Sequence, residues 1–171
     1  MLQSQTESVK QQFGEMQSLQ DSLGAQLEVL ECQGTDLETV LEKLREIDRC
    51  TQLIRSNPRS AEFFLNRGEV RQSLARVEDS RLAIDDYTQA IELDPTMAKA
   101  YFNRGVLRSE LDERRPAGED LRMASKCYFD QGDMDNYAEA KRLSEQIYEK
   151  LEQRAEEEVK EEKLRAADLF A

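Results

Sequence analysis

Histidine is absent from the 171 residues of this chain, and so is tryptophan. Without histidine the chain cannot build a serine–histidine–acid triad or a cysteine–histidine pair, and most zinc sites are excluded. The seven glycines are isolated from one another, so no glycine-rich phosphate loop is present. Adjacent carboxylates, as at residues 85–86 and 156–158, point in different directions on a helix, which predicts solvated faces and no acid–base pair. We therefore expect a non-enzyme with no catalytic residue, no cofactor and no metal site.

Cysteine is scarce, and the three copies, Cys32, Cys50 and Cys127, lack the spacing of a metal site. An odd number of cysteines indicates reduced thiols in a cytosol-like compartment. We expect Cys127, which stands beside Tyr128 and Phe129, to be a buried structural thiol. The expected location is the cytoplasm or a reducing compartment such as the plastid stroma.

Long apolar runs are also missing. No segment approaches the roughly 20 apolar residues of a membrane span, and the first residues lack the basic start and apolar stretch of a secretory signal. A net charge of −12 argues against nucleic acid, because phosphates would be repelled. Arg104 with Arg108, and Arg114 with Arg115, leave local basic patches open. We expect protein partners, no nucleic acid and no membrane span.

Proline occurs only at Pro58, Pro95 and Pro116, and each copy stands where a helix is expected to begin or end. Strand-like alternation is absent, and the apolar residues recur every three or four positions instead. Charged residues make up 35% of the chain. This combination predicts an all-α, elongated protein with much solvated surface.

The first 57 residues carry two apolar stripes. One runs from Leu2 to Leu30 with a near-heptad spacing, interrupted by two glycines, and the other runs from Leu37 to Ile54. Between them, residues 35–38 have the form of a capping box, which marks a helix start. We interpret residues 1–57 as an N-terminal helical hairpin or coiled coil. In such a hairpin Cys32 lies far from Cys50, so the two are not expected to form a disulfide.

The middle of the chain repeats itself. The segment Phe-Leu-Asn-Arg-Gly at residues 64–68 returns as Tyr-Phe-Asn-Arg-Gly at 101–105, an offset of 37. Residues 83–87 with Ala90 match residues 117–121 with Ala124, an offset of 34 at every matched position. The difference of three residues predicts an insertion between Arg71 and Ala83, in the first turn between helices.

These positions resemble the tetratricopeptide-repeat (TPR) family, whose period is 34 residues. The resemblance covers roughly residues 58–133, and its matches are Phe64, Gly68, Ala83, Tyr87, Ala90 and Pro95, then Tyr101, Gly105, Ala117, Leu121 and Ala124. Arg67 and Arg104 stand where the family usually has leucine. Phe129 replaces the second closing proline, so that helix is expected to run on toward Gly132. The resemblance implies an α-solenoid of two helical hairpins whose helices cross at the glycines and alanines.

Two hairpins alone leave apolar ends exposed, so flanking helices must cover them. The helix from Asp36, which ends before Pro58, is a candidate second helix of a degenerate preceding repeat. Residues 134–171 are expected to form a long capping helix, sealed onto the second repeat by a stripe from Tyr137 to Leu151. Residues 152–163 are expected to be a solvated extension. The apolar end, Leu164 to Phe170, remains open as a frayed end, a self-association surface or a docking motif.

The resemblance also implies a binding surface, because stacked hairpins expose a concave face lined by the first helix of each repeat. Family register places Glu62, Leu65, Glu69, Gln72 and Ser73, then Lys99, Phe102, Val106, Ser109 and Glu110 on this face. Our candidate partner-binding residues are Leu65, Glu69, Gln72, Lys99, Phe102, Asn103 and Val106, and we call them the predicted concave face. For Phe102 two interpretations stay open: an exposed binding anchor, or a core residue covered by the N-terminal hairpin or by the inserted turn around Val77. A family-type clamp for a terminal carboxylate is not favoured, because Glu69 would repel that group.

The amino-acid sequences of the repeats also resemble those of small cyanobacterial and plastid repeat proteins, several of which are assembly factors. We therefore expect a non-catalytic adaptor or assembly factor that binds a peptide or helix of a partner protein on the concave face. The alternative is a structural coiled-coil protein that self-associates through its terminal helices, with the repeats as a rigid spacer.

Overall fold

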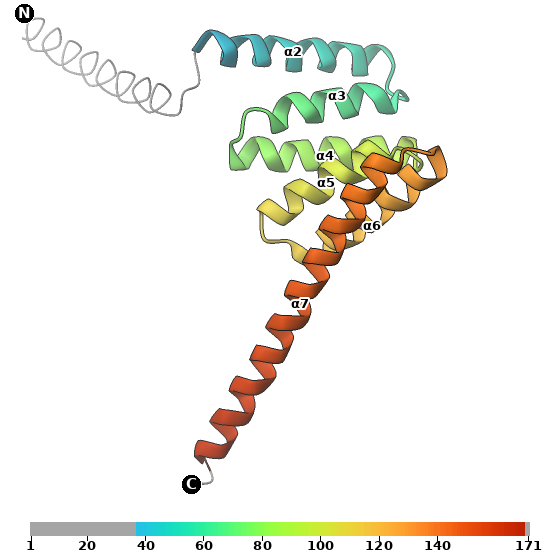
Figure 1. Ribbon diagram of the computed structural model, residues 1–171. Helices are drawn as coiled ribbons and strands as arrows, with labels where there is room; N and C mark the ends of the chain where they lie inside the picture. Colours follow the sequence, from blue (N-terminus) through green and yellow to red (C-terminus); the bar gives the residue numbers. More distant parts are fainter. Residues whose placement is uncertain (1–36, 170–171) are drawn as a thin grey trace, which may run out of the picture. The chain divides into compact units, whose positions relative to one another are not determined.

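The computed structural model describes residues 37–169, which contain six α-helices and no strand (Figure 1). The helices are α2 (Leu37–Ser56), α3 (Ala61–Gln72), α4 (Val77–Leu93), α5 (Ala98–Glu110), α6 (Arg114–Gln131) and α7 (Met134–Leu169). The all-α prediction is confirmed, and the second apolar stripe is helix α2. The first stripe, the start of the capping box and Cys32 lie outside the described residues. The chain divides into two compact units after Leu44.

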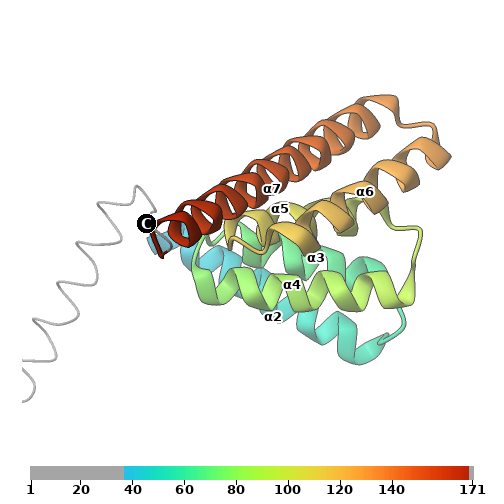
Figure 2. The same ribbon diagram turned by 90° about the horizontal axis from the view of Figure 1, so that it is seen from below.

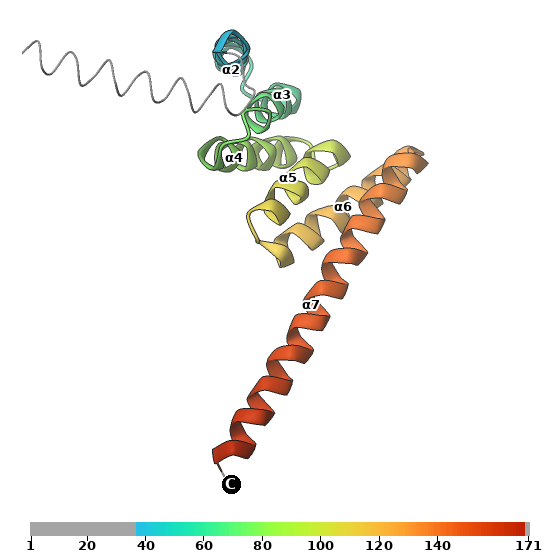
Figure 3. The same cartoon turned by 60° about the vertical axis from the view of Figure 1, so that its left-hand side comes forward.

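Helices α3 with α4, and α5 with α6, form the two predicted hairpins, and from α3 onward each helix packs on the next one in the chain. Figures 2 and 3 show these helices as successive layers, with α7 lying along α6. The loops that join them contain Pro58 and Pro95, as expected from residues that cannot continue a helix. Pro116, by contrast, is the third residue of α6, within the first turn, where its missing N–H costs nothing.

The two helices of each hairpin approach closely at the predicted glycines. A Cβ atom on Gly68 would lie 2.6 Å from a ring carbon of Tyr87, and one on Gly105 would lie 2.9 Å from Cγ of Leu121. Alanines fill the rest of each crossing, and the four matched ones are completely buried: Ala83, Ala90, Ala117 and Ala124. The repeat pattern therefore identified the packing positions correctly.

The three-residue insertion lies mostly in a helix and not in the turn where it was expected. Ala83 is the seventh residue of α4, whereas its match Ala117 is the fourth residue of α6. The extra residues thus add nearly one turn to the start of α4. Glu78 and Asp79 stand in this added turn, where acidic side chains favour a helix start.

Helix α6 continues to Gln131 and stops at Gly132, as predicted. Gly132 has a φ of +76°, its N–H donates to the carbonyl of Phe129, and the N–H of Asp133 donates to the carbonyl of Tyr128. This pair of bonds is the Schellman arrangement, which requires the left-handed conformation that glycine adopts freely. The side chain of Asp133 then accepts the N–H of Asn136 at 3.2 Å and starts α7.

Helix α7 covers the second repeat with the predicted stripe. Ala140 and Ile147 are buried, and Ser144 donates to the carbonyl of Gly118 at 3.3 Å. Beyond Leu151 the side chains of residues 152–161 are exposed, and this half of the helix projects past the other helices (Figures 1 and 3). Within the described part of the chain, no helix has both the length and the apolar character needed to cross a bilayer.

Candidate functional site

A buried ion network joins the helices of the first repeat. Asp86 on α4 is only 2% exposed. It accepts hydrogen bonds from Arg67 at 2.6 Å and from Arg71 at 2.7 Å, two residues one turn apart on α3. Arg67 also donates to the hydroxyl of Thr51 on α2 at 3.1 Å, so one arginine links three consecutive helices.

The second repeat contains the same network. Asp120 on α6 is 4% exposed and accepts from Arg104 at 2.7 Å and Arg108 at 2.8 Å. Arg104 donates to Thr88 on α4 at 2.9 Å. Thr88 follows Thr51 by 37 positions, as Arg104 follows Arg67. The hydrogen bond that joins α2 to α3 is therefore equivalent to the one that joins α4 to α5, which supports the assignment of α2 as the second helix of a preceding repeat.

These networks correct two expectations from the sequence. Asp86 was grouped with Asp85 on a solvated face, but Asp85 is exposed and Asp86 is buried. Arg104 and Arg108 were left open as a basic patch, but both guanidinium groups are bound to Asp120. The signal was present, because both arginines and the aspartate recur at the repeat offsets of 37 and 34. A charge that repeats in register with buried glycines is better explained as part of the packing than as surface.

The predicted concave face has a polar centre between α3 and α5. The carboxylate of Glu69 lies 2.6 Å from the ammonium of Lys99 and accepts a hydrogen bond from the amide of Asn103 at 3.1 Å. The side chains of Glu69 and Lys99 are 31% and 57% exposed. Three of the predicted residues are therefore brought into direct contact at the surface, and Glu69 is neutralised by its neighbours.

Gln72 belongs to the same polar group through Tyr87. The Tyr87 hydroxyl donates to the Gln72 side-chain oxygen at 2.7 Å. Burial raises the pKa of Tyr87 well above its usual range, and the nearby Glu69 carboxylate raises it further. Tyr87 therefore stays protonated and supports Gln72 from beneath the face through this hydrogen bond.

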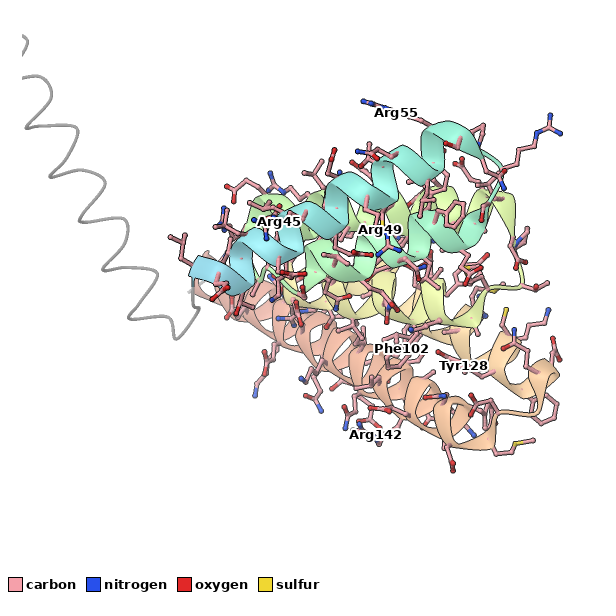
Figure 4. The ribbon with its side chains drawn as sticks, turned by 90° about the horizontal axis from the view of Figure 1, so that it is seen from above. Arg45, Arg49, Arg55, Phe102, Tyr128 and Arg142 are labelled. Atoms are coloured by element: carbon pink, nitrogen blue, oxygen red, sulfur yellow. The ribbon has the colours of Figure 1, made fainter. Side chains whose placement is uncertain are left out.

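The structure places Leu65 and Phe102 deeper than the polar residues. Leu65 is 8% exposed and belongs to a core cluster with Tyr87 and Ala100, so it supports the face from below. Phe102 is half-buried and meets the ring of Tyr128 edge-on, with the centroids 6.3 Å apart (Figure 4). Among the described residues its cover comes from α6 and α7, and not from the turn near Val77 that the sequence suggested.

A pocket of about 230 Å³ opens beside Val106, where α5, α6 and α7 meet. Its apolar walls are Val106, Leu121, Leu143 and Ile147, and its polar rim is Ser109, Glu110, Gln146 and Lys150. The sequence named Val106 as a surface residue but gave no sign of the pocket, because the opposite wall comes from the capping helix.

Reactive and metal-binding groups are not assembled in the described residues. Within residues 37–169 no group of three histidine, cysteine or acidic side chains could hold a metal ion. Cys127 is 8% exposed, as predicted for a structural thiol, and Cys50 is 3% exposed. Burial raises the pKa of both thiols, which keeps them protonated and unreactive at neutral pH.

Comparison with known proteins identifies the fold. No protein-family model matches the chain, and no curated protein is significantly similar to it in sequence.

Among solved structures, the TPR2B domain of yeast Sti1 in its pHsp70 complex is 23% identical, with a TM-score of 0.56 over 72% of this chain and 96% of that one. PcrH in complex with the chaperone binding region of PopD is 19% identical, with a TM-score of 0.60 over 74% and 94%. The first TPR of Spaghetti (RPAP3), bound to the HSP90 peptide SRMEEVD, is 23% identical, with a TM-score of 0.56 over 72% and 90%. The chain has the TPR fold.

Proposed function

We propose that this protein is a non-catalytic adaptor or assembly factor that binds a peptide or helix of a partner protein on the predicted concave face. The observation that carries the proposal is the arrangement of this face. One helix, α5, presents Lys99 and Asn103, which belong to the neutralised polar centre, and Val106, which lines the apolar pocket. A surface of this kind offers hydrogen bonds for a backbone and an apolar anchor point for a side chain.

Two further observations support the proposal. The Sti1, PcrH and RPAP3 structures that share this fold are complexes with a peptide or protein partner. The face itself rests on a rigid base, because the two ion networks and the glycine crossings fix α3 and α5 relative to each other and to α4 and α6. A preformed face of this kind loses less conformational entropy when a partner binds.

The projecting half of α7 favours a second candidate function. Residues 152–161 are exposed along one continuous helix, so this segment is an arm that could serve a structural or self-association role. Sedimentation velocity of the full chain distinguishes this alternative. A concentration-dependent dimer that binds no other protein would favour the structural role.

Affinity capture from the native cell tests the main proposal. The bait is the full chain, compared with a Lys99→Glu, Val106→Glu double variant and with a Leu82→Glu control on the exposed part of α4. We expect the control to retain the partner and the double variant to lose it, with all three proteins sharing the wild-type circular dichroism spectrum. Equal capture by the double variant would exclude the concave face as the binding site.

A further inference from the structure

The two repeats differ at one equivalent position of the predicted concave face. Glu69 on α3 and Val106 on α5 are 37 residues apart, the offset that relates Gly68 to Gly105. Each side chain points toward the next helix along the face. The same place in the fold is thus acidic in the first repeat and apolar in the second.

At the first of these positions the gap is closed. Glu69 reaches across to α5 and is held by Lys99 and Asn103, so the space between α3 and α5 is filled by an ion pair and a hydrogen bond. At the second position Val106 packs with Leu143 and Ile147 of α7, and these apolar side chains form no hydrogen bond or ion pair with one another. The unfilled space beside them is the pocket.

The size of the pocket limits what it can hold. Pockets for small molecules usually enclose about 300–1,000 Å³. A volume of about 230 Å³ is below that range but above the engineered 150 Å³ cavities that admit a benzene ring. One aliphatic side chain of leucine or methionine size fits this space, which is the usual form of an anchor site in protein recognition.

The basic side chains near the pocket rim differ in whether they already form an ion pair. Lys150 lines this pocket and also the adjoining surface with Arg114 and Arg154. Arg114 is paired with Asp112 at 2.7 Å and Arg154 with Glu158 at 3.4 Å, whereas Lys150 has no ion-pair partner among the residues that the structure describes. Glu110 on the α5 side and Glu157 further along α7 are the acidic residues that line these two surfaces.

We propose that this pocket is the anchor site of the concave face, and that it takes an aliphatic side chain from a partner peptide that carries a carboxylate next to that side chain. The aliphatic group packs on Val106, Leu143 and Ile147, and the carboxylate pairs with Lys150 on the α7 side of the rim, away from Glu110. This proposal rests on the proposed function and adds the chemistry of the partner.

Methyl-detected NMR of the full chain, titrated with blocked synthetic peptides, tests the proposal. The probe is acetyl-Ala-Ala-Leu-Glu-Glu-Ala-amide, compared with a peptide that has Lys-Lys in place of Glu-Glu and with one that has Ala in place of Leu. We expect saturable shifts of the Val106, Leu143 and Ile147 methyl groups. Binding should weaken by up to about fivefold with Lys-Lys, the upper range for an exposed ion pair. It should weaken by about tenfold or more without the leucine.

Two variants provide the controls. Lys150→Glu, at an exposed position, should reverse the order of the Glu-Glu and Lys-Lys peptides while leaving the spectrum otherwise unchanged. Val106→Glu, which copies the residue of the first repeat into the second, should abolish the shifts, and Leu82→Glu on α4 should not.

The outcomes separate this inference from the proposed function. Absent shifts at the three methyl groups, or equal binding of the Glu-Glu and Lys-Lys peptides, would overturn the anchor site. If the partner captured from cells still depends on Lys99 in that case, the proposed function stands and only the pocket assignment falls. Loss of both results would overturn the two together.

Discussion

The two buried aspartates define the energetics of this fold at the scale of single residues. Asp86 and Asp120 each form ion pairs with two arginines from the neighbouring helix, in positions where only 2% and 4% of the residue is exposed. Removing one member of such a group leaves buried charge without a partner, which is more costly than the pair is stabilising. Each aspartate is therefore expected to be much less tolerant of substitution than the acidic surface residues beside it.

Asp86→Asn is expected to lower the free energy of unfolding by about 3–5 kcal/mol, because Arg67 and Arg71 lose their counter-charge. Its neighbour Asp85 is the matched control, and Asp85→Asn should change stability by less than about 0.5 kcal/mol. Urea denaturation followed by circular dichroism measures both. Equal effects of the two substitutions would show that Asp86 is solvated after all.

Gly105→Leu is expected to destabilise the chain by about 1–3 kcal/mol or more. A first side-chain carbon at this position already lies 2.9 Å from Leu121 and 3.2 Å from the carbonyl of Ala117, so α5 and α6 would have to separate. The thermal midpoint reports the change. An unchanged midpoint would mean that the two helices do not cross at Gly105.

The buried thiols predict a dependence of stability on alkaline pH. Cys50 and Cys127 have raised pKa values in the folded protein because of burial, whereas a thiol in the unfolded chain titrates near 8.5. Their contribution is complete below that pH. It is lost as the pH rises, since only the unfolded chain releases the protons. Urea midpoints should fall between pH 7.5 and 9.5, and a Cys50→Ala, Cys127→Ala variant should show a smaller fall over the same interval.

At the scale of helices, the sequence predicted the elements better than their environments. Proline and glycine mark where helices end because their backbone chemistry acts locally, so the stop at Gly132 could be read without any tertiary information. The added turn of α4 was assigned to the loop instead, because an offset between repeats shows only that residues were inserted. The pocket could not be predicted either, since its walls combine α5 with a capping helix that lies outside the repeat pattern.

Helix α7 combines a packed environment and an exposed environment within one element. Its first half is a packing surface and its second half is an exposed arm, so the same substitution should have different effects along it. Ile147→Ala is expected to cost about 2–5 kcal/mol, because Ile147 is 8% exposed against Ala117 and Leu121. Val159→Ala, at a residue that is 50% exposed, should stay within about 0.5 kcal/mol. Comparable losses at both positions would mean that the arm is packed in solution.

At the scale of the whole molecule, the offsets of 34 and 37 residues between the repeats predicted the fold correctly. The seven candidate binding residues, by contrast, divide into three groups in the structure. Glu69, Lys99, Asn103 and Gln72 form the polar centre, Leu65 belongs to the core, and Phe102 and Val106 flank the contact with α7. Family register gives the direction of a side chain but not the neighbour that covers it. Partner binding on the predicted concave face therefore remains a proposal. The resemblance of the repeat sequences to cyanobacterial and plastid proteins stays a prediction.

The central claim is that a partner protein occupies the face lined by α5, and site-specific photo-crosslinking in the native cell tests it most directly. A benzophenone amino acid is placed singly at Lys99 and Val106 on this face, and at Leu82 and Gln89 on the exposed part of α4. We predict that the two α5 positions crosslink to one and the same protein and that the two α4 positions do not. Crosslinks to that protein from α4 alone, or equally from all four positions, would contradict the claim.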